Sequence, residues 1–448
     1  MKFVLAFYGT RGDVEPGLAI GRELLRRGHD VRMAVPPDLV GFAESVGLEA
    51  IAYGPDMEAW LEVTRNFWAR LFRNFWRIRD VQELLREARE PGTRCWAEMS
   101  AALVSLTDGA DVLLTGMSYQ ELAANVAEHR NIRLATLLWF PTRVNGHLVP
   151  NLPPPLVRSA MTVYEWLVWR GVKKAQDAQR RELGLPKVTG PAPRRIAERG
   201  ALEIQAYDAV CFPGLDVEWA KWGGQRPFVG TLTLQLATDA DGEVASWIAD
   251  GRPPIFFGFG SIPVESPTDT IAMIAGACAQ LGERALVSAG WTDFSNVPDT
   301  EHVKVVGAVN YAAIFPACRA VVHHGGAGTT AAGLRAGVPA LILWMADVQF
   351  MWGAAVKRLK VGVARRLSGW LRANQPTPLR PANSSTRSAA AATLLAGSVI
   401  RVAISRARAA YSGARMVRRS ETSDFSVVVE KRRATPTFSR LTAAPHMN

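Results

Sequence analysis

Apolar runs and amphipathic stretches alternate along the first third of the chain. The continuous apolar runs, each of strand length, span residues 2–8, 30–35, 112–115 and 134–138. The stretches with helical spacing that separate them span residues 16–27, 38–46 and 120–129. Strands that are apolar throughout are buried on both faces, as in a parallel sheet between layers of helices. The pattern predicts an open α/β sheet.

The same alternation starts again at residue 254. The predicted strands of this half span residues 255–259, 285–289, 302–306, 320–322 and 338–344, and the predicted helices span residues 269–281 and 329–336. A chain of 448 residues exceeds one ordinary core. We therefore expect one Rossmann-like domain over residues 1–222, a Gly- and Pro-containing linker over 223–253, a second domain over 254–368 and a separate tail over 369–448. Two such sheets leave a cleft at the carboxyl ends of their strands.

A glycine-rich turn joins two of the predicted strands in the second half. It reads His323-His324-Gly325-Gly326-Ala327-Gly328-Thr329-Thr330. Glycines let a ligand approach the backbone, and the helix that follows points unpaired N–H groups at it. The turn is thus a candidate diphosphate site, with an imidazole and the hydroxyls of Thr329 and Thr330 as further donors. The alternative is a structural turn whose histidines only fill space.

Composition favours a soluble protein of a reducing compartment. Hydrophobic residues make up 48% and charged residues 21% of the chain. No apolar stretch approaches the roughly 20 residues of a membrane span, and the first residues do not resemble a signal peptide. The four cysteines show neither metal-ligand spacing nor a disulfide framework. We expect a cytoplasmic protein in which Asp239-Ala240-Asp241 is a solvated loop and no metal is bound.

The net charge of +11 belongs almost entirely to the tail. Residues 369–448 hold 13 basic and three acidic groups, a net of +10, which leaves +1 for residues 1–368. A neutral body argues against a nucleic-acid partner. The tail lacks a steady helical stripe and is predicted to be disordered. It is either the product of a shifted reading frame or an authentic basic tail that binds anionic lipid.

Aromatic and basic residues gather between Arg65 and Arg79. In a helix, Phe and Trp side chains would form one stripe flanked by arginines. One interpretation is a helix that packs on the domain and lines an apolar pocket. The other is an interfacial helix on an anionic membrane, at the inner face of the cell membrane. Both interpretations indicate a hydrophobic ligand. A second amphipathic helix, rich in Trp and Arg, is predicted over residues 161–183.

Three motifs together resemble the GT-B glycosyltransferases that use nucleotide sugars. They are residues 9–16 (Gly-Thr-Arg-Gly-Asp-Val-Glu-Pro), residues 257–261 (Phe-Gly-Phe-Gly-Ser), and the turn at 323–330 with its continuation to Gln349 and Trp352. The nearest likeness is to sterol, glycopeptide-antibiotic and mycobacterial glycolipid glycosyltransferases, over about residues 1–368. The resemblance implies two Rossmann-like domains, an inverting reaction and no cofactor beyond the nucleotide-sugar co-substrate.

The resemblance also implies a role for particular residues. Asp13 matches the base that takes the proton of the acceptor hydroxyl, although the alternative of a helix-capping aspartate remains open. The residues that match the donor site are Ser261, His324, Gly325, Gly326, Gly328, Thr329, Asp347 and Gln349. Asp347 departs from the usual pattern, in which Asp and Gln are adjacent.

These observations predict a metal-independent hexosyltransferase that glycosylates a hydroxyl of a lipid, sterol or lipopeptide-like acceptor. Two alternatives remain. One is a binding protein whose unusual tail prevents the two domains from closing, and the other is a nucleotide-sugar epimerase of the same fold.

Overall fold

The computed structural model describes most of residues 1–366. The described residues are 1–57, 94–149, 152–260, 266–290, 294, 302–344 and 348–366, together with residues 414–416 and 429–431. The aromatic stretch at 65–79, Ser261 and Asp347 lie outside them. So does nearly all of the tail that is predicted to be disordered. Within the tail, β13 (Ala414–Met416) and β14 (Val429–Lys431) pair antiparallel.

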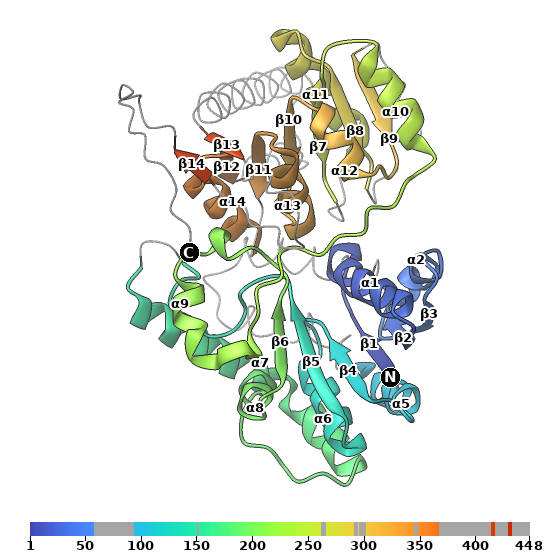
Figure 1. The fold of residues 1–448 in the computed structure, drawn as a ribbon, viewed down its shortest axis with the longest axis vertical. Helices are drawn as coiled ribbons and strands as arrows, with labels where there is room; N and C mark the ends of the chain where they lie inside the picture. The colour runs from blue at the N-terminus through green and yellow to red at the C-terminus, as the bar shows by residue number, and fades with distance from the viewer. Residues whose placement is uncertain are drawn as a thin grey trace, which may run out of the picture.

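The first half of the chain folds into one parallel sheet with helices on both faces (Figure 1). Its strands are β1 (Lys2–Ala6), β2 (Asp30–Val35), β3 (Glu49–Ala52), β4 (Val112–Thr115), β5 (Arg133–Leu138) and β6 (Leu202–Gln205). Its helices are α1 (Arg11–Arg26), α2 (Val40–Glu44), α5 (Trp96–Leu106), α6 (Gln120–Arg130), α7 (Pro154–Glu182), α8 (Ala192–Glu198) and α9 (Leu215–Trp219).

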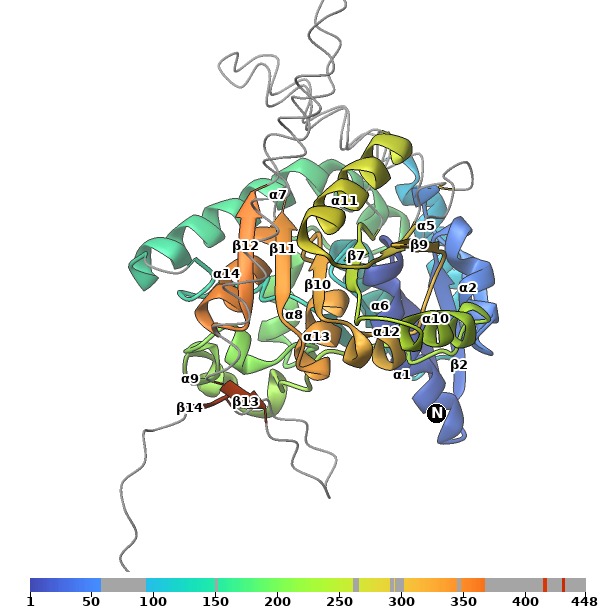
Figure 2. The ribbon, with the colours of Figure 1, turned by 90° about the horizontal axis from the view of Figure 1, so that it is seen from above.

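The second half repeats this architecture. Its strands are β7 (Ile255–Gly258), β8 (Ala285–Ser288), β9 (Val303–Val306), β10 (Ala320–His323), β11 (Ala340–Trp344) and β12 (Gly362–Arg366). Its helices are α10 (Ala240–Ala249), α11 (Pro267–Leu281), α12 (Tyr311–Ile314), α13 (Ala327–Ala336) and α14 (Val348–Arg358). Figure 2 shows strands β12, β11, β10 and β7 side by side in this sheet.

Both sheets have the same strand order. The first runs β3-β2-β1-β4-β5-β6 and the second β12-β11-β10-β7-β8-β9, with every neighbouring pair parallel. Each is the doubly wound Rossmann order, which reverses direction between its two central strands, β1 and β4 or β7 and β10. The predicted pair of Rossmann-like sheets is confirmed.

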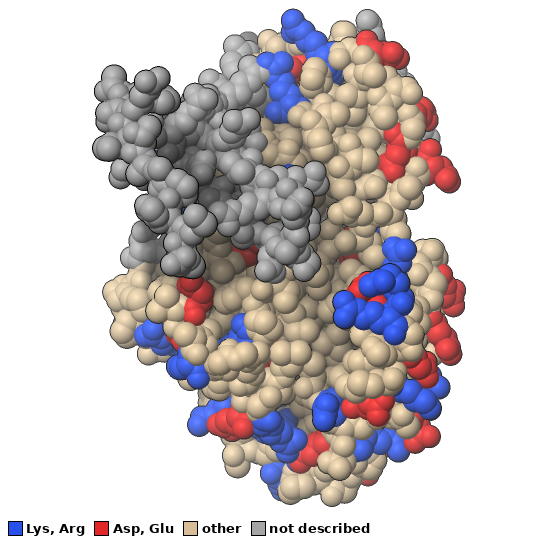
Figure 3. Space-filling model, in the orientation of Figure 1, with Lys and Arg blue, Asp and Glu red and all other residues tan. Residues whose placement is uncertain are grey.

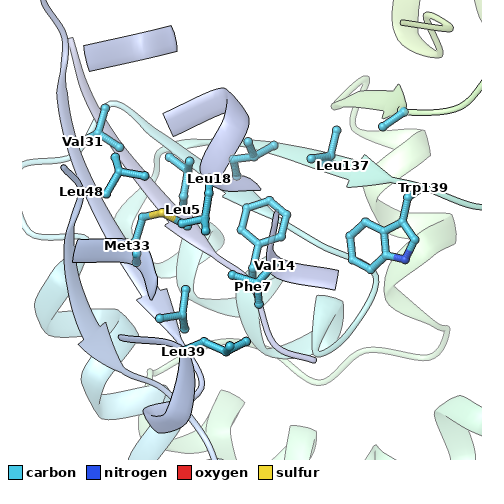
Figure 4. Close-up of a cluster of buried hydrophobic side chains, with 14 of the residues drawn as sticks. Leu5, Phe7, Val14, Leu18, Val31, Met33, Leu39, Leu48, Leu137 and Trp139 are labelled. Carbon is cyan, nitrogen blue, oxygen red and sulfur yellow. The ribbon is translucent and has the colours of Figure 1, made fainter. Parts of the chain in front are cut away.

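Alternation along β1 divides the first core into two layers. Leu5 and Phe7 belong to a buried cluster with residues of α1 and β2, while Val4 and Ala6 belong to another with residues of α5 and α6. Successive side chains of a strand point to opposite faces, so one strand serves both layers. Figure 4 shows the first cluster, with Trp139 at the end opposite Val31.

A third apolar cluster joins the two halves of the chain. Phe140 and Phe212 of the first half pack with Ile342 and Trp352 of the second. The rings of Phe212 and Trp352 meet edge to face with centroids 5.3 Å apart, and Trp352 is 1% exposed. Because every member of this cluster precedes residue 369, the contact between the halves is made without the tail.

Two helices begin earlier than the sequence predicts. The helix predicted from Pro16 begins at Arg11, because Thr10 and Asp13 form a capping box at its start. The helix predicted from residue 161 begins at Pro154, with proline in its first turn. Proline is favoured in the first turn of a helix, where its missing N–H has no partner to lose.

The Asp239-Ala240-Asp241 stretch is not the solvated loop that was predicted. Ala240 begins α10, and the Asp241 carboxylate accepts hydrogen bonds of 2.8 Å from the amides of Thr238 and Asn310. The carboxylate therefore fastens α10 to the segment before α12. The described part of the chain contains no cluster of His, Cys, Asp and Glu able to hold a metal ion. It also contains no helix that is both long and apolar enough to cross a membrane.

Candidate active site at the facing ends of the two sheets

Asp13 lies in the first turn of α1, directly after β1. The Thr10 amide and hydroxyl donate to its Oδ2 atom at 2.7 and 2.9 Å. Gly9 has a φ of +143°, and a Cβ placed on it would lie 2.4 Å from Oδ2. Glycine at this position therefore makes room for the carboxylate. The capping role and the predicted site position belong to the same side chain.

Burial raises the pKa of the Asp13 carboxyl above its usual 3.8, and hydrogen bonds from Thr10 and Trp139 oppose this rise. Trp139 follows β5 and packs in the same apolar cluster as Val14. Desolvation disfavours a carboxylate and so makes it a stronger base, whereas donated hydrogen bonds stabilise it. Burial has the larger effect here, which is the direction expected of a carboxylate that acts as a base.

His324 follows β10 and lies between two glycines. A Cβ on Gly260 would approach its Cε1 atom to 2.4 Å, and a Cβ on Gly326 would approach Nε2 to 2.7 Å. Both distances are shorter than real contacts allow, so this position of the imidazole requires glycine on either side. The pairing of β7 with β10 brings Gly260 close to His324. The two strands are parallel and Gly258 lies opposite His323, so the residues that follow them leave the sheet side by side.

The His324 ring is neutral at physiological pH. Burial lowers its pKa from 6.5 to about 4, against a smaller opposite effect of the Gly258 backbone. Its Nδ1 atom is buried and has no hydrogen-bond partner among the described residues. Buried polar atoms are nearly always satisfied, so one without a partner beside a glycine-rich turn indicates a place for a ligand.

His323 and Gly325 shape the turn. The Gly325 amide donates to His323 Nδ1 at 3.1 Å, so this N–H is already used within the protein. Gly325 has a φ of +97°, and a Cβ on it would lie 2.9 Å from Ile342 Cγ2. His323 is 2% exposed, and burial lowers its pKa to about 3. Each ring has one buried nitrogen without a partner among the described residues, Nε2 in His323 and Nδ1 in His324, so the unpaired nitrogen alone does not distinguish the two histidines.

The amino terminus of α13 presents free backbone donors. Gly326 is its N-cap and supplies no capping side chain. The first N–H groups of a helix have no intrahelical acceptor and carry the positive end of its dipole, so those of Ala327, Gly328 and Thr329 suit an anion. The Thr330 hydroxyl instead donates to the Gly326 carbonyl at 2.8 Å. Thr330 was expected to offer this hydroxyl to the ligand and does not.

Residues 231–234 fasten this helix to α1. The Leu234 amide donates to Glu15 Oε1 at 2.9 Å. On the other side, Arg335 donates to the Thr231 carbonyl at 3.0 Å and to Thr233 Oγ1 at 3.1 Å. We call residues 231–234 the strap. The sequence indicated only a linker here, because nothing in its composition reveals contacts with two distant helices.

The two walls of the site also touch directly. Ala327, in the first turn of α13, packs against the apolar cluster that contains Val14 and Trp139. Asp13 and the His324 turn thus lie on elements that contact each other, each at the switch point of its sheet. Figure 3 shows an indentation of the surface between the two lobes, at the right-hand edge of the view. Open α/β sheets bind ligands at such points.

Gln349 is the remaining described residue of the predicted donor site. It lies in the first turn of α14, and its Cβ and carbonyl oxygen would each lie 3.2 Å from a Cβ on Gly325. The structure therefore brings Gln349 next to the turn. The other functional positions that the sequence did not single out are Trp139 and Gly260. Trp139 ends an apolar run, and Gly260 lies inside a recognised motif.

Two Rossmann sheets with a site between their facing ends define the GT-B class of glycosyltransferases. Residues 3–92 match the model of the glycosyltransferase family 28 N-terminal domain. Residues 284–377 match that of the erythromycin biosynthesis protein CIII-like C-terminal domain. The first of these descriptions names a glycosyltransferase domain.

Two relatives that align over most of this chain are also named as glycosyltransferases. The chain is 59% identical over 371 residues to an uncharacterised glycosyltransferase of Mycobacterium tuberculosis. The alignment covers 82% of this chain and 87% of the relative. It is 29% identical over 377 residues to a sterol 3-beta-glucosyltransferase of Arabidopsis thaliana, covering 81% of this chain and 57% of that protein. The protein belongs to the same glycosyltransferase family as the mycobacterial relative.

A solved structure supports the fold. The Streptomyces sp. SF2575 glycosyltransferase SsfS6, complexed with thymidine diphosphate, aligns with a TM-score of 0.54 and 19% identity. The alignment covers 90% of this chain and 99% of that one. At this identity the likeness establishes the GT-B architecture.

Proposed function

We propose that the protein transfers a sugar from a nucleoside-diphosphate donor to a hydroxyl of a hydrophobic acceptor, with inversion at the anomeric carbon. The observation that carries the proposal is the juxtaposition of two walls. One holds a carboxylate whose pKa is raised by burial, and the other holds a neutral imidazole beside an uncapped helix amino terminus. A base and an anion site on contacting elements suit displacement of a diphosphate by a hydroxyl.

In the proposed reaction Asp13 accepts the proton of the acceptor hydroxyl. The two hydrogen bonds from Thr10 to its Oδ2 atom, together with the one from Trp139, hold the carboxylate in place. The acceptor oxygen then forms a bond to the anomeric carbon. The bond between that carbon and the phosphate oxygen breaks, and its electron pair leaves with the nucleoside diphosphate. Attack from the face opposite the leaving group inverts the configuration.

On the donor side, His324 and the first amides of α13 stabilise the leaving diphosphate. A neutral imidazole donates one N–H through the nitrogen that carries its proton, and the amides add fixed dipoles. Removing one such donor from an enzyme typically reduces the rate about 10²–10³-fold. In this proposal no metal takes part, and the nucleotide sugar is a co-substrate, so no cofactor is needed. Gln349 would contact the sugar hydroxyls.

Aromatic side chains near the end of β1 support a hydrophobic acceptor. The rings of Tyr8 and Trp96 contact that of Tyr119 edge to face, with centroids 5.1 and 5.8 Å away. Tyr119 has a φ of +55°, an uncommon backbone conformation for a residue other than glycine, and such residues cluster at functional sites. The relative from Arabidopsis named as a sterol 3-beta-glucosyltransferase also supports an apolar acceptor.

The test is a mass-spectrometric binding screen of nucleotide sugars, followed by transfer assays with sterol and lipid alcohols. The proposal expects one donor to bind and to yield both a glycosylated product and free nucleoside diphosphate. Formation of an epimer of the donor without any acceptor would establish the epimerase instead. Binding of a donor without turnover towards any alcohol would favour the binding protein.

A further inference from the structure

Helix α7 carries apolar side chains on its solvent side. In most surface helices the apolar face is the buried one. Here Val157 and Trp169 are buried, yet most other large apolar residues of the same segment are exposed. The exposed large hydrophobic residues in and just before this segment, with their exposed fractions, are Leu152 52%, Leu156 62%, Val163 56%, Tyr164 70%, Trp166 48%, Leu167 51% and Val168 39%.

The spacing places part of this group on one line. Leu156, Val163 and Leu167 are seven and four residues apart, which puts them above one another on a helix. Trp166 flanks the line, with the Arg170 guanidinium 5.4 Å from its ring centroid. We call Leu156, Val163, Trp166 and Leu167 the α7 face. Figure 2 shows α7 running along the edge of the molecule.

Positive charge accompanies the α7 face. Residues 154–177 contain the basic residues Arg158, Arg170, Lys173 and Lys174 and the acids Glu165 and Asp177; Arg158 pairs with Glu218, and Lys173 pairs with Asp177. Burial raises the pKa of the Glu165 carboxyl. Arg170 and Lys174 are both exposed. An exposed apolar stripe with an aromatic edge and a cationic border is the pattern of a helix that lies in a membrane interface.

The α7 face is held rigidly by the rest of the fold. Arg158 Nε lies 2.7 Å from Glu218 Oε1, and the same carboxylate accepts from the Gly146 amide at 2.9 Å. Farther along α7, Gln179 Nε2 donates to the Ser100 hydroxyl of α5 at 3.0 Å. The apolar exposure is therefore a property of an anchored helix, not of a frayed end.

The start of α7 lies near the acceptor side of the site. The chain leaves β5 through Trp139, which hydrogen-bonds to Asp13, and a Cβ on Gly146 would lie 2.6 Å from Pro154 Cβ. A surface on which this helix rested would meet the domain that carries Asp13.

We propose that the α7 face docks on the surface of an anionic lipid bilayer. A single convex helix face has no groove to receive a protein segment, whereas it can sink into the headgroup region along its whole length. This inference goes beyond the proposed reaction and does not depend on it, because lipid binding is measured without donor or acceptor. It is also separate from the membrane contact expected for residues 65–79.

The experiment is co-sedimentation of the full chain with vesicles of phosphatidylcholine and phosphatidylglycerol, and with pure phosphatidylcholine vesicles. The test variant is Val163→Ser with Leu167→Ser. The matched control is Leu202→Ser with Val229→Ser, since these side chains are 42% and 46% exposed but lie elsewhere. Because the basic tail is the same in all proteins, a parallel series in about 1 M salt screens its contribution.

The proposal expects the partition coefficient of the test variant on anionic vesicles to fall at least about tenfold. The control should stay within about twofold of the wild type. The emission of a fluorescent label attached at Leu167→Cys should shift to the blue when vesicles are added, and the emission of a label at Val229→Cys should not. Equal partitioning of the two variants would overturn the proposal. So would a wild-type dimer in sedimentation equilibrium that the test variant abolishes, since the face would then belong to a second copy.

Discussion

Gly326→Ala tests the donor site with little disturbance of the backbone. Gly326 has a φ of −64° and a ψ of 146°, which any residue can adopt, so alanine introduces no strain in the chain. The one severe conflict is with the side chain of His324, whose Nε2 atom would lie 2.7 Å from the new Cβ. The substitution therefore acts on the imidazole.

The size of the effect follows from this distance. Ordinary contacts of a Cβ begin at 3.4 Å, so the ring must move by roughly 0.7 Å, the difference between 3.4 and 2.7 Å. A displacement of that order breaks a hydrogen bond to a diphosphate. Hydrogen bonds to charged groups contribute about 1.5–3 kcal/mol. The dissociation constant for a nucleoside diphosphate should therefore rise by about ten- to a hundredfold.

Isothermal titration with uridine and thymidine diphosphate measures this constant. Gly333→Ala is the matched control, because Gly333 lies in the same helix and a Cβ on it meets no atom within 4 Å. Replacing this helical glycine should stabilise the protein by about 0.5–1 kcal/mol and leave binding unchanged. If both variants bound the diphosphate like the wild type, His324 would not be a phosphate ligand.

Two further predictions concern stability. Phe212→Ala removes a ring from the cluster between the two halves and should lower the unfolding free energy by about 3–5 kcal/mol, measured by urea denaturation; a loss below 1 kcal/mol would show that this contact is unimportant. Burial lowers the His324 pKa from 6.5 to about 4, so between these values the unfolded chain binds a proton that the folded chain does not. The stability that depends on this group is therefore lost as the pH falls through that window. In His324→Gln, the unfolding free energy measured by urea denaturation should decline less steeply between these two pH values. An unchanged slope would contradict the lowered pKa.

The sequence predicted the strands whose residues are apolar throughout. Strands β1, β5 and β10 lie inside their sheets and read as continuous apolar runs. A strand that is buried on both faces needs apolar residues at successive positions, so the sequence shows it directly. The short strands β3, β6 and β12 were missed. Each lies at an edge of its sheet and includes polar or exposed residues, which removes the apolar signal.

The sequence named candidate residues for the site but did not show how they are arranged. The resemblance named Asp13 and His324, and the fold brings their elements into contact. Nothing in the sequence showed that Gly260 and Gly326 make room for one imidazole, or that the strap holds α1 to α13. Such contacts join residues far apart in the chain. The Thr330 hydroxyl, in contrast, makes a local contact with the Gly326 carbonyl inside the helix.

The central claim is that Asp13 is the base and that the donor binds on the opposite wall. The most direct measurement compares wild type and Asp13→Asn for nucleoside-diphosphate binding and for transfer to an alcohol found active in the acceptor screen. The asparagine can still accept the hydrogen bonds from Thr10, so the helix start should be preserved. The account predicts a dissociation constant within about twofold of wild type and a transfer rate lower by about 10²–10⁴-fold. Undiminished transfer by Asp13→Asn would contradict it.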